Sequence, residues 1–232
     1  MKTTTCCAAA LALAWLGYAA SAAAAASVQS AAPANPDPGM KYLFYMHGQS
    51  VETNQPVEGV PVEYEKILQA FADRGFVAIG ERRGTVKQGD YARKIAGQVR
   101  ALIASGVPAR NITVSGHSKG GMIAMNVATM IDAPDLNYIN MAGCGRPGTP
   151  FERGADEFAQ QGAKKMRGRL LVFYDRADKI GGPCPPQLFE RATALTQKQQ
   201  SVLATDRGHA LFARPDPRWL DIVQAWAEGR AP

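Results

Sequence analysis

One pentapeptide, Gly116-His117-Ser118-Lys119-Gly120, constrains this chain more than any other feature. A β-branched run at 111–114 predicts a buried strand before it, and the apolar residues 122–130 predict a helix after it. A serine on such a sharp strand-to-helix turn has a strained backbone, and glycines flank it because side chains there would collide with neighbouring elements. The start of the following helix offers an N–H group and a positive dipole end to a developing oxyanion. We therefore expect Ser118 to be a nucleophile.

The rest of the chain alternates short apolar strands with helices. Strands are predicted at 41–46, 76–79, 111–114, 136–142, 169–174 and 200–204, and helices at 62–72, 91–104 (N-capped by Asp90), 122–130, 155–165, 185–196 and 217–228. Apolar strands without polar alternation are typical of a parallel sheet covered on both faces. We expect one doubly wound α/β domain over residues 40–232, with a mostly parallel sheet of about six strands. Ligands bind such folds at the carboxyl ends of the strands.

The N-terminal residues differ in composition from this body. Lys2, the apolar stretch 8–18 and a tract of small residues that follows predict a cleavable secretory signal peptide over residues 1–26. The alternative is an anchor that is retained. Cleavage is expected between Ala22 and Ala26, with a periplasmic or secreted product. Residues 27–39, with three prolines, are predicted to form a flexible, extended leader.

Charge and composition narrow the class of partner. The formal net charge of +6 falls to +5 when Lys2 leaves with the signal, and no dense stripe of Lys and Arg predicts nucleic-acid binding. No run of eighteen apolar residues occurs outside the first thirty positions, so no stable membrane span is expected in the mature body. No Cys/His cluster predicts a metal site, and no cofactor is expected. The partner we expect is a small-molecule substrate.

A serine nucleophile needs a base within hydrogen-bond reach. The chain has three histidines. His117 sits beside Ser118 on the turn, where its side chain should point away, and His47 follows an early strand, where it is better placed to shape a loop. His209 follows the last predicted strand in a Gly-His turn, and we favour it as the base.

The base in turn needs an acid that orients it. Asp175 and Asp178 both follow the strand at 169–174. Asp178 is favoured because a residue deeper in the turn can reach the next strand end, whereas Asp175 can start the turn with bonds to its own backbone. Asp206 is a third candidate, but it lies so close to His209 in sequence that a turn-forming role fits it better.

Two backbone N–H groups are candidates for an oxyanion hole, those of Lys119 and of Gln49 in the loop after the strand at 41–46. The charged run Glu81-Arg82-Arg83 also follows a strand. It either rims the crevice and favours an anionic substrate, or forms a solvated loop.

Taken together, these residues resemble the α/β-hydrolases. The chain order Ser118, Asp178, His209 is the order used in that family, and His47-Gly48 is similar to its oxyanion loop. Residues 173–178 and Gly208-His209 resemble its acid and histidine loops. The resemblance covers roughly residues 41–226 and implies the family's sheet without its first two strands. The segment between the strands at 136–142 and 169–174 is too short for a large lid, so little or no cap is expected.

In this resemblance Cys144 follows the strand at 136–142, and Cys184 follows the acid loop after the next strand. We expect these neighbouring strand ends to bring the two residues within the roughly 4.4–6.8 Å between Cα atoms that a disulfide needs. They are also the even pair left after removal of the signal segment from a protein bound for an oxidising compartment. A disulfide is therefore predicted, the alternative being two buried thiols.

The expected activity is ester hydrolysis through an acyl-enzyme on Ser118, with His209 as base and Asp178 as its partner. A short cap implies an open site and a small or exposed acyl group. Thioester or peptide cleavage would use the same triad. The alternative of another class is a non-catalytic binding protein that keeps this fold, because a fold does not determine function.

Overall fold

The computed structural model describes residues 26–231, so the predicted signal peptide lies almost wholly outside the described residues. A seven-stranded sheet in the order β1-β3-β2-β4-β5-β7-β9 forms its centre, and every neighbouring pair is parallel. The strands are β1 (Ser27–Gln29), β2 (Lys41–Met46), β3 (Phe76–Ile79), β4 (Ile112–His117), β5 (Asn137–Met141), β7 (Gly168–Asp175) and β9 (Leu195–Leu203). Two further short strands, β6 (Cys144–Gly145) and β8 (Gly181–Gly182), pair antiparallel with each other.

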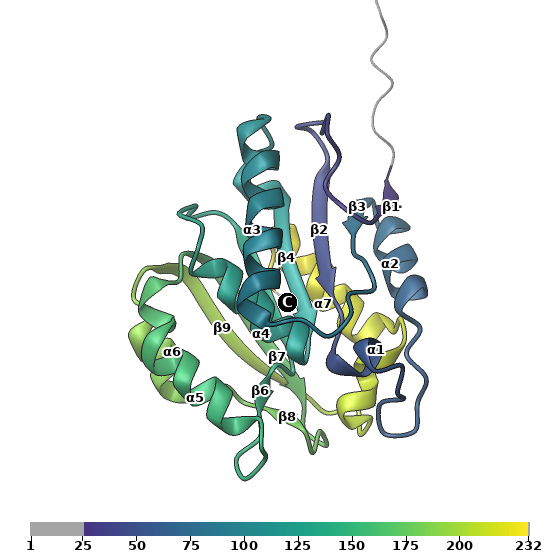
Figure 1. Cartoon of the computed structure of the whole chain (residues 1–232), viewed down its shortest axis with the longest axis vertical. Helices are drawn as coiled ribbons and strands as arrows, with labels where there is room; N and C mark the ends of the chain where they lie inside the picture. Colours follow the sequence, from purple (N-terminus) through teal and green to yellow (C-terminus); the bar gives the residue numbers. More distant parts are fainter. Residues whose placement is uncertain (1–25, 232) are drawn as a thin grey trace, which may run out of the picture.

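Helices cover both faces of this sheet (Figure 1). The α-helices are α1 (Gln49–Glu52), α2 (Tyr64–Ala72), α3 (Gln88–Ala104), α4 (Lys119–Ala128), α5 (Glu152–Gln161), α6 (Pro186–Arg191) and α7 (Pro217–Ala227), and the 3₁₀ helices are η1 (Ala109–Asn111), η2 (Ala163–Lys165) and η3 (Gly208–Ala213). Side chains of α3, α4, α5 and α6 pack into the core on one face, and those of α2, η3 and α7 into the core on the other. No helix within residues 26–231 has the length and apolar character needed to cross a membrane.

The central strands are buried along their whole length, and most of their side chains are apolar because both faces of the sheet are covered. In β2, Tyr42 and Phe44 point into one core, while Leu43 and Tyr45 point into the other. Burial on both faces removes the polar alternation that a half-exposed strand would show. The predicted parallel, doubly covered sheet is thereby confirmed.

The segment 27–39, predicted to be a flexible, extended leader, instead packs against the rest of the domain. Ser27–Gln29 forms β1 and adds a seventh strand beside β3. The Ala32 N–H also donates to the Gln98 side chain on α3 at 2.7 Å. An edge strand needs only one hydrogen-bonded neighbour and is partly solvated, so three residues of mixed polarity can form it without an apolar pattern. This strand also lies before the point at which the family resemblance begins.

The last predicted strand is longer than expected, and the helix before it is shorter. Helix α6 ends at Arg191, and β9 begins at Leu195 instead of Gln200. Strand β9 is the other edge of the sheet, and most of its side chains are exposed or half-buried. Its run of Thr, Gln and Lys therefore carries little apolar signal. Asp90 is not the N-cap of α3 either, because that helix begins at Gln88, with Lys87 at the N-cap position.

Candidate active site

The backbone at Ser118 has the strained geometry that the pentapeptide predicts. Ser118 lies between β4 and α4 with φ 55° and ψ −123°, and its N–H donates to the Met141 carbonyl at 2.8 Å. A Cβ on Gly116 would lie 2.3 Å from the Gly120 backbone, and one on Gly120 would lie 2.0 Å from the Met46 carbonyl oxygen. Real Cβ contacts are never so short, so both glycines are required for this turn to pack against the sheet.

His209 and Asp178 are joined by a hydrogen bond. The Nδ1 atom of His209 lies 2.7 Å from Oδ2 of Asp178, and both side chains are almost fully buried. The other carboxylate oxygen of Asp178 accepts from the N–H groups of Ile180 and Gly181 at 2.8 and 2.7 Å. A proton on Nδ1 leaves Nε2 as the ring's free acceptor. This is the tautomer that a serine base requires.

The carboxylate of Asp175 makes its hydrogen bonds to other residues and none to His209. Its carboxylate accepts from the hydroxyl and N–H of Thr205 and from the N–H groups of Ala177 and Gly208. Burial raises the pKa of Asp175, but these hydrogen bonds lower it below its ordinary value overall. The side chain therefore fastens the start of the β7 turn to the end of β9. Asp206 lies on an exposed turn with φ 57°.

The other two histidines are buried in different surroundings. The His117 ring packs 4.4 Å from the His209 ring and 4.9 Å from Phe212, and burial together with the neighbouring His209 holds its pKa well below the ordinary value. The Nε2 atom of His47 accepts from the N–H of Arg83 at 3.0 Å, so Nδ1 carries the hydrogen that is donated to the Gly48 carbonyl. Burial, and secondly the charge of Arg83, lowers the pKa of His47 to about 4.

Gln49 and Lys119 are the first residues of α1 and α4. The first N–H groups of a helix have no partner inside it and are available to an anion. Gly48 lies against Ser118, since a Cβ on Gly48 would be 3.2 Å from Cβ of Ser118. The two predicted donors thus begin helices on either side of Ser118.

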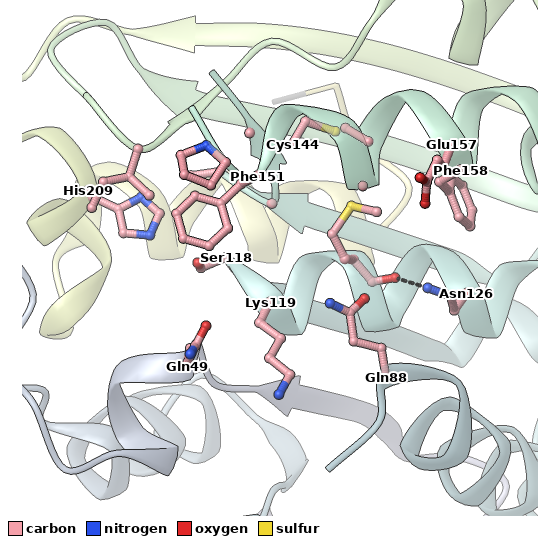
Figure 2. Close-up of a pocket in the computed structure, with 18 of the residues that line it drawn as sticks. Gln49, Gln88, Ser118, Lys119, Asn126, Cys144, Phe151, Glu157, Phe158 and His209 are labelled. Atoms are coloured by element: carbon pink, nitrogen blue, oxygen red, sulfur yellow. Dashed lines mark hydrogen bonds between the residues drawn. The ribbon is translucent and has the colours of Figure 1, made fainter. Parts of the chain in front are cut away.

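A buried charge cluster adjoins these two helix starts. Glu52 accepts from Arg83 at 2.8 Å and from Lys119 at 2.7 Å, and the three side chains are 1%, 2% and 15% exposed, respectively. Arg83 therefore does not rim the crevice. Arg82 does lie on the surface, where it pairs with Glu65. The Lys119 ammonium is held by Glu52, and in Figure 2 its side chain extends away from Ser118.

The predicted disulfide between Cys144 and Cys184 is present, with 5.0 Å between the Cα atoms. Cys144 is in β6, which pairs with β8, and Gly181 of β8 donates to Asp178. The bond therefore braces the loop that carries this acid. The Asn140 amide lies beside both sulfurs, and its oxygen accepts from the N–H of Gly143 next to Ser118.

A cleft of about 1100 Å³ runs from Ser118 along α4. Figure 2 shows Ser118 and His209 at one end, with Phe151 beside them, and Asn126, Glu157 and Phe158 at the other. Phe151 is 53% exposed. One wall of the cleft is formed by α5, the single α-helix between β5 and β7 in the described part of the chain. The cleft is thus open and mixed in polarity.

Sequence reasoning did not identify Glu52, Asn140 or Gly143. Glu52 lies in a polar stretch that shows no period, and Asn140 is a polar residue inside an apolar strand. Asparagine buried in a central strand is itself a signal, because a buried amide must find hydrogen-bond partners. Glu52 had no comparable signal, since its burial depends on Arg83 and Lys119, 31 and 67 residues away.

Comparison of the sequence with protein-family models and with curated proteins found no match. Several solved structures share the fold. One, from work on the metagenome-derived lipolytic enzymes LipS and LipT, has a TM-score of 0.55 and 14% identity, covering 82% of this chain and 96% of its own. MGS-MChE2, an α/β-hydrolase enzyme from a lagoon-sediment metagenome, has a TM-score of 0.51 and 16% identity, covering 82% and 91%. SOBER1 of Arabidopsis thaliana has a TM-score of 0.51 and 11% identity, covering 83% and 99%.

Proposed function

We propose that this protein, whose fold is that of the α/β-hydrolases, is a serine hydrolase that cleaves an ester through an acyl-enzyme. One observation carries the proposal. The strained Ser118 and His209 lie at one end of the same cleft, and His209 is hydrogen-bonded to the buried Asp178. The three residues follow three separate strands. A binding protein has no need of a strained serine beside a buried, oriented imidazole.

In this mechanism the hydroxyl of Ser118 attacks the ester carbonyl while Nε2 of His209 takes its proton. Asp178 keeps the imidazole in the required tautomer and stabilises the imidazolium that forms. The backbone N–H groups of Gln49 and Lys119 donate to the oxyanion. His209 then gives the proton to the leaving alcohol, and water attacks the acyl-enzyme by the reverse sequence.

The cleft supports a small-molecule substrate and modest selectivity of the enzyme among such substrates. It is open along one side, and both apolar and polar side chains line it. The published description of one fold neighbour as a lipolytic enzyme favours an ester over a thioester or peptide as the first substrate to test.

We also propose export to the periplasm or the exterior after cleavage between Ala22 and Ala26. The disulfide supports this location, because such bonds persist in oxidising compartments. Residues 27–231 form the folded body with β1 at its start, so the cleavage site would immediately precede the first strand.

The test is hydrolysis of short-chain p-nitrophenyl esters by the mature protein and by Ser118→Ala. The wild type is expected to turn over with burst kinetics, and the variant to lose roughly 10³-fold or more of kcat. Circular dichroism and thermal melting of both proteins provide the control for folding. A folded wild type that hydrolyses no ester, thioester or peptide substrate would favour the binding-protein alternative.

A further inference from the structure

Helix α1, which carries one proposed oxyanion donor, is a single turn of four residues. One turn of helix is not stable by itself, so its position depends on tertiary contacts. Gln49 begins this turn and Glu52 ends it. The contacts of the Glu52 carboxylate are therefore among those that hold the turn beginning at Gln49.

The Glu52 carboxylate bridges to the second donor. Its Oε2 atom accepts from Nζ of Lys119 at 2.7 Å, and the N–H of the same lysine is the other proposed donor. Figure 2 shows the Gln49 and Lys119 side chains on neighbouring elements beside Ser118. This ion pair joins the last residue of α1 to the first residue of α4.

Arg83 contacts residues on both sides of Gln49. It donates to Oε1 of Glu52 at 2.8 Å, its guanidinium donates to the His47 carbonyl, and its N–H donates to the His47 ring. The segment from His47 to Glu52, which contains Gln49, is thus held by Arg83 at both of its ends. The Glu52 carboxylate is the group shared by both ion pairs.

The loss of hydration on burial offsets much of the free energy that these ion pairs contribute to stability. A carboxylate that is 1% exposed loses its hydration, and ion pairs at such sites often do no better for stability than apolar side chains of the same volume. The ion pairs of Glu52 do hold Arg83 and Lys119 in one geometry. Catalysis of acyl transfer needs both N–H groups fixed before the oxyanion forms.

We propose that Glu52 is a positioning residue, which sets the separation of the Gln49 and Lys119 N–H groups through its ion pairs with Arg83 and Lys119. The inference rests on the proposed hydrolase function and assigns a role to Glu52, which does not line the cleft. It predicts that the Lys119 side chain matters for turnover even though its backbone N–H is the donor.

The test compares Glu52→Gln and Lys119→Met, with Lys119→Arg as the conservative variant. Matched controls are Glu65→Gln, which breaks the exposed pair with Arg82, and Lys66→Met, which breaks the exposed pair with Glu63. For each protein kcat, KM, the inhibition constant of a trifluoromethyl ketone, the pH profile of kcat/KM and the melting temperature are measured. Lys119→Met keeps the Glu52–Arg83 pair, so it tests the proposal even if Glu52→Gln fails to fold.

We expect both variants to lose roughly 10- to 100-fold of kcat with little change in KM, since a small misplacement of an oxyanion donor costs about that much. Binding of the ketone, which forms an oxyanion on the serine, should weaken in parallel, while the pH profile keeps its shape because His209–Asp178 is intact. Lys119→Arg should recover most of the loss, and both controls should match the wild type.

Two results would overturn the inference. The first is a Lys119→Met variant whose kcat stays within about twofold of that of an active wild type. The second is a variant of Glu52 or Lys119 that loses thermal stability while its affinity for the ketone is unchanged. A folded wild type without any hydrolase activity refutes the proposed function itself, and an active wild type with active variants refutes this inference alone.

Discussion

Two aspartates three residues apart at the end of β7 have separate surroundings. Asp178 orients His209, while Asp175 joins the β7 turn to Thr205 and Gly208. The proposed triad therefore predicts opposite results for the same substitution at the two sites, although the side chains are chemically identical.

For Asp178→Asn we expect a fall in kcat of roughly 10⁴-fold, because an amide favours the wrong histidine tautomer. For Asp175→Asn we expect most of kcat to remain and the free energy of unfolding to fall by about 1–3 kcal/mol, since hydrogen bonds to a buried carboxylate are lost. Steady-state kinetics and urea denaturation measure the two effects. A kinetic loss confined to Asp175→Asn would contradict the assignment of the acid.

His47 makes stability depend on pH. Its pKa is about 4 in the folded protein, through burial and then the charge of Arg83, and 6.5 is its ordinary value. Between these values the unfolded chain binds more protons, so the contribution is present above pH 6.5 and is lost as the pH falls toward 4. The expected slope is up to about 1.4 kcal/mol per pH unit from this residue.

The measurement is the free energy of unfolding at pH 7 to 4.5 for the wild type and His47→Gln. The variant should be less stable at pH 7 and should show a flatter fall with acid. His117 has its pKa lowered as well and keeps part of the slope in the variant. Identical slopes for both proteins would contradict the account.

At the scale of elements, the disulfide between Cys144 and Cys184 should affect both the stability of the fold and the position of the loop that carries Asp178. The bond spans 40 residues, and the loop-entropy model gives about 3–4 kcal/mol for such a span. Replacing both cysteines by alanine should lower the free energy of unfolding by that amount. Activity should also fall, because β6 and β8 support the N–H groups that hold Asp178.

Denaturation and ester hydrolysis of this double variant measure both effects. The wild type treated with a reductant serves as the comparison without substitution. Full activity in a clearly destabilised variant would show that the bond braces the fold and has no influence on the acid.

The elements that the sequence predicts well are those buried on both faces. Strands β2, β3, β4, β5 and β7 show as apolar runs, and polar residues after them mark the carboxyl edge of the sheet. Both edge strands, β1 and β9, were missed or cut short because partial exposure leaves no pattern. The burial of Glu52 could not be predicted for a related reason, because it depends on ion pairs with residues distant in the sequence.

At the scale of the whole molecule, two cores and a parallel sheet bring residues from distant segments to one edge. Ser118, Asp178 and His209 follow β4, β7 and β9, while Gln49 lies just beyond β2. The central claim is that Ser118 is a nucleophile activated at this edge.

Covalent labelling tests that claim most directly. The mature protein is incubated with a fluorophosphonate, and the adduct is located by intact-mass measurement and peptide mapping. We expect one adduct, on Ser118, that is absent from Ser118→Ala and forms far more slowly in His209→Ala. A folded wild type that remains unlabelled, or an adduct on another residue, would contradict it.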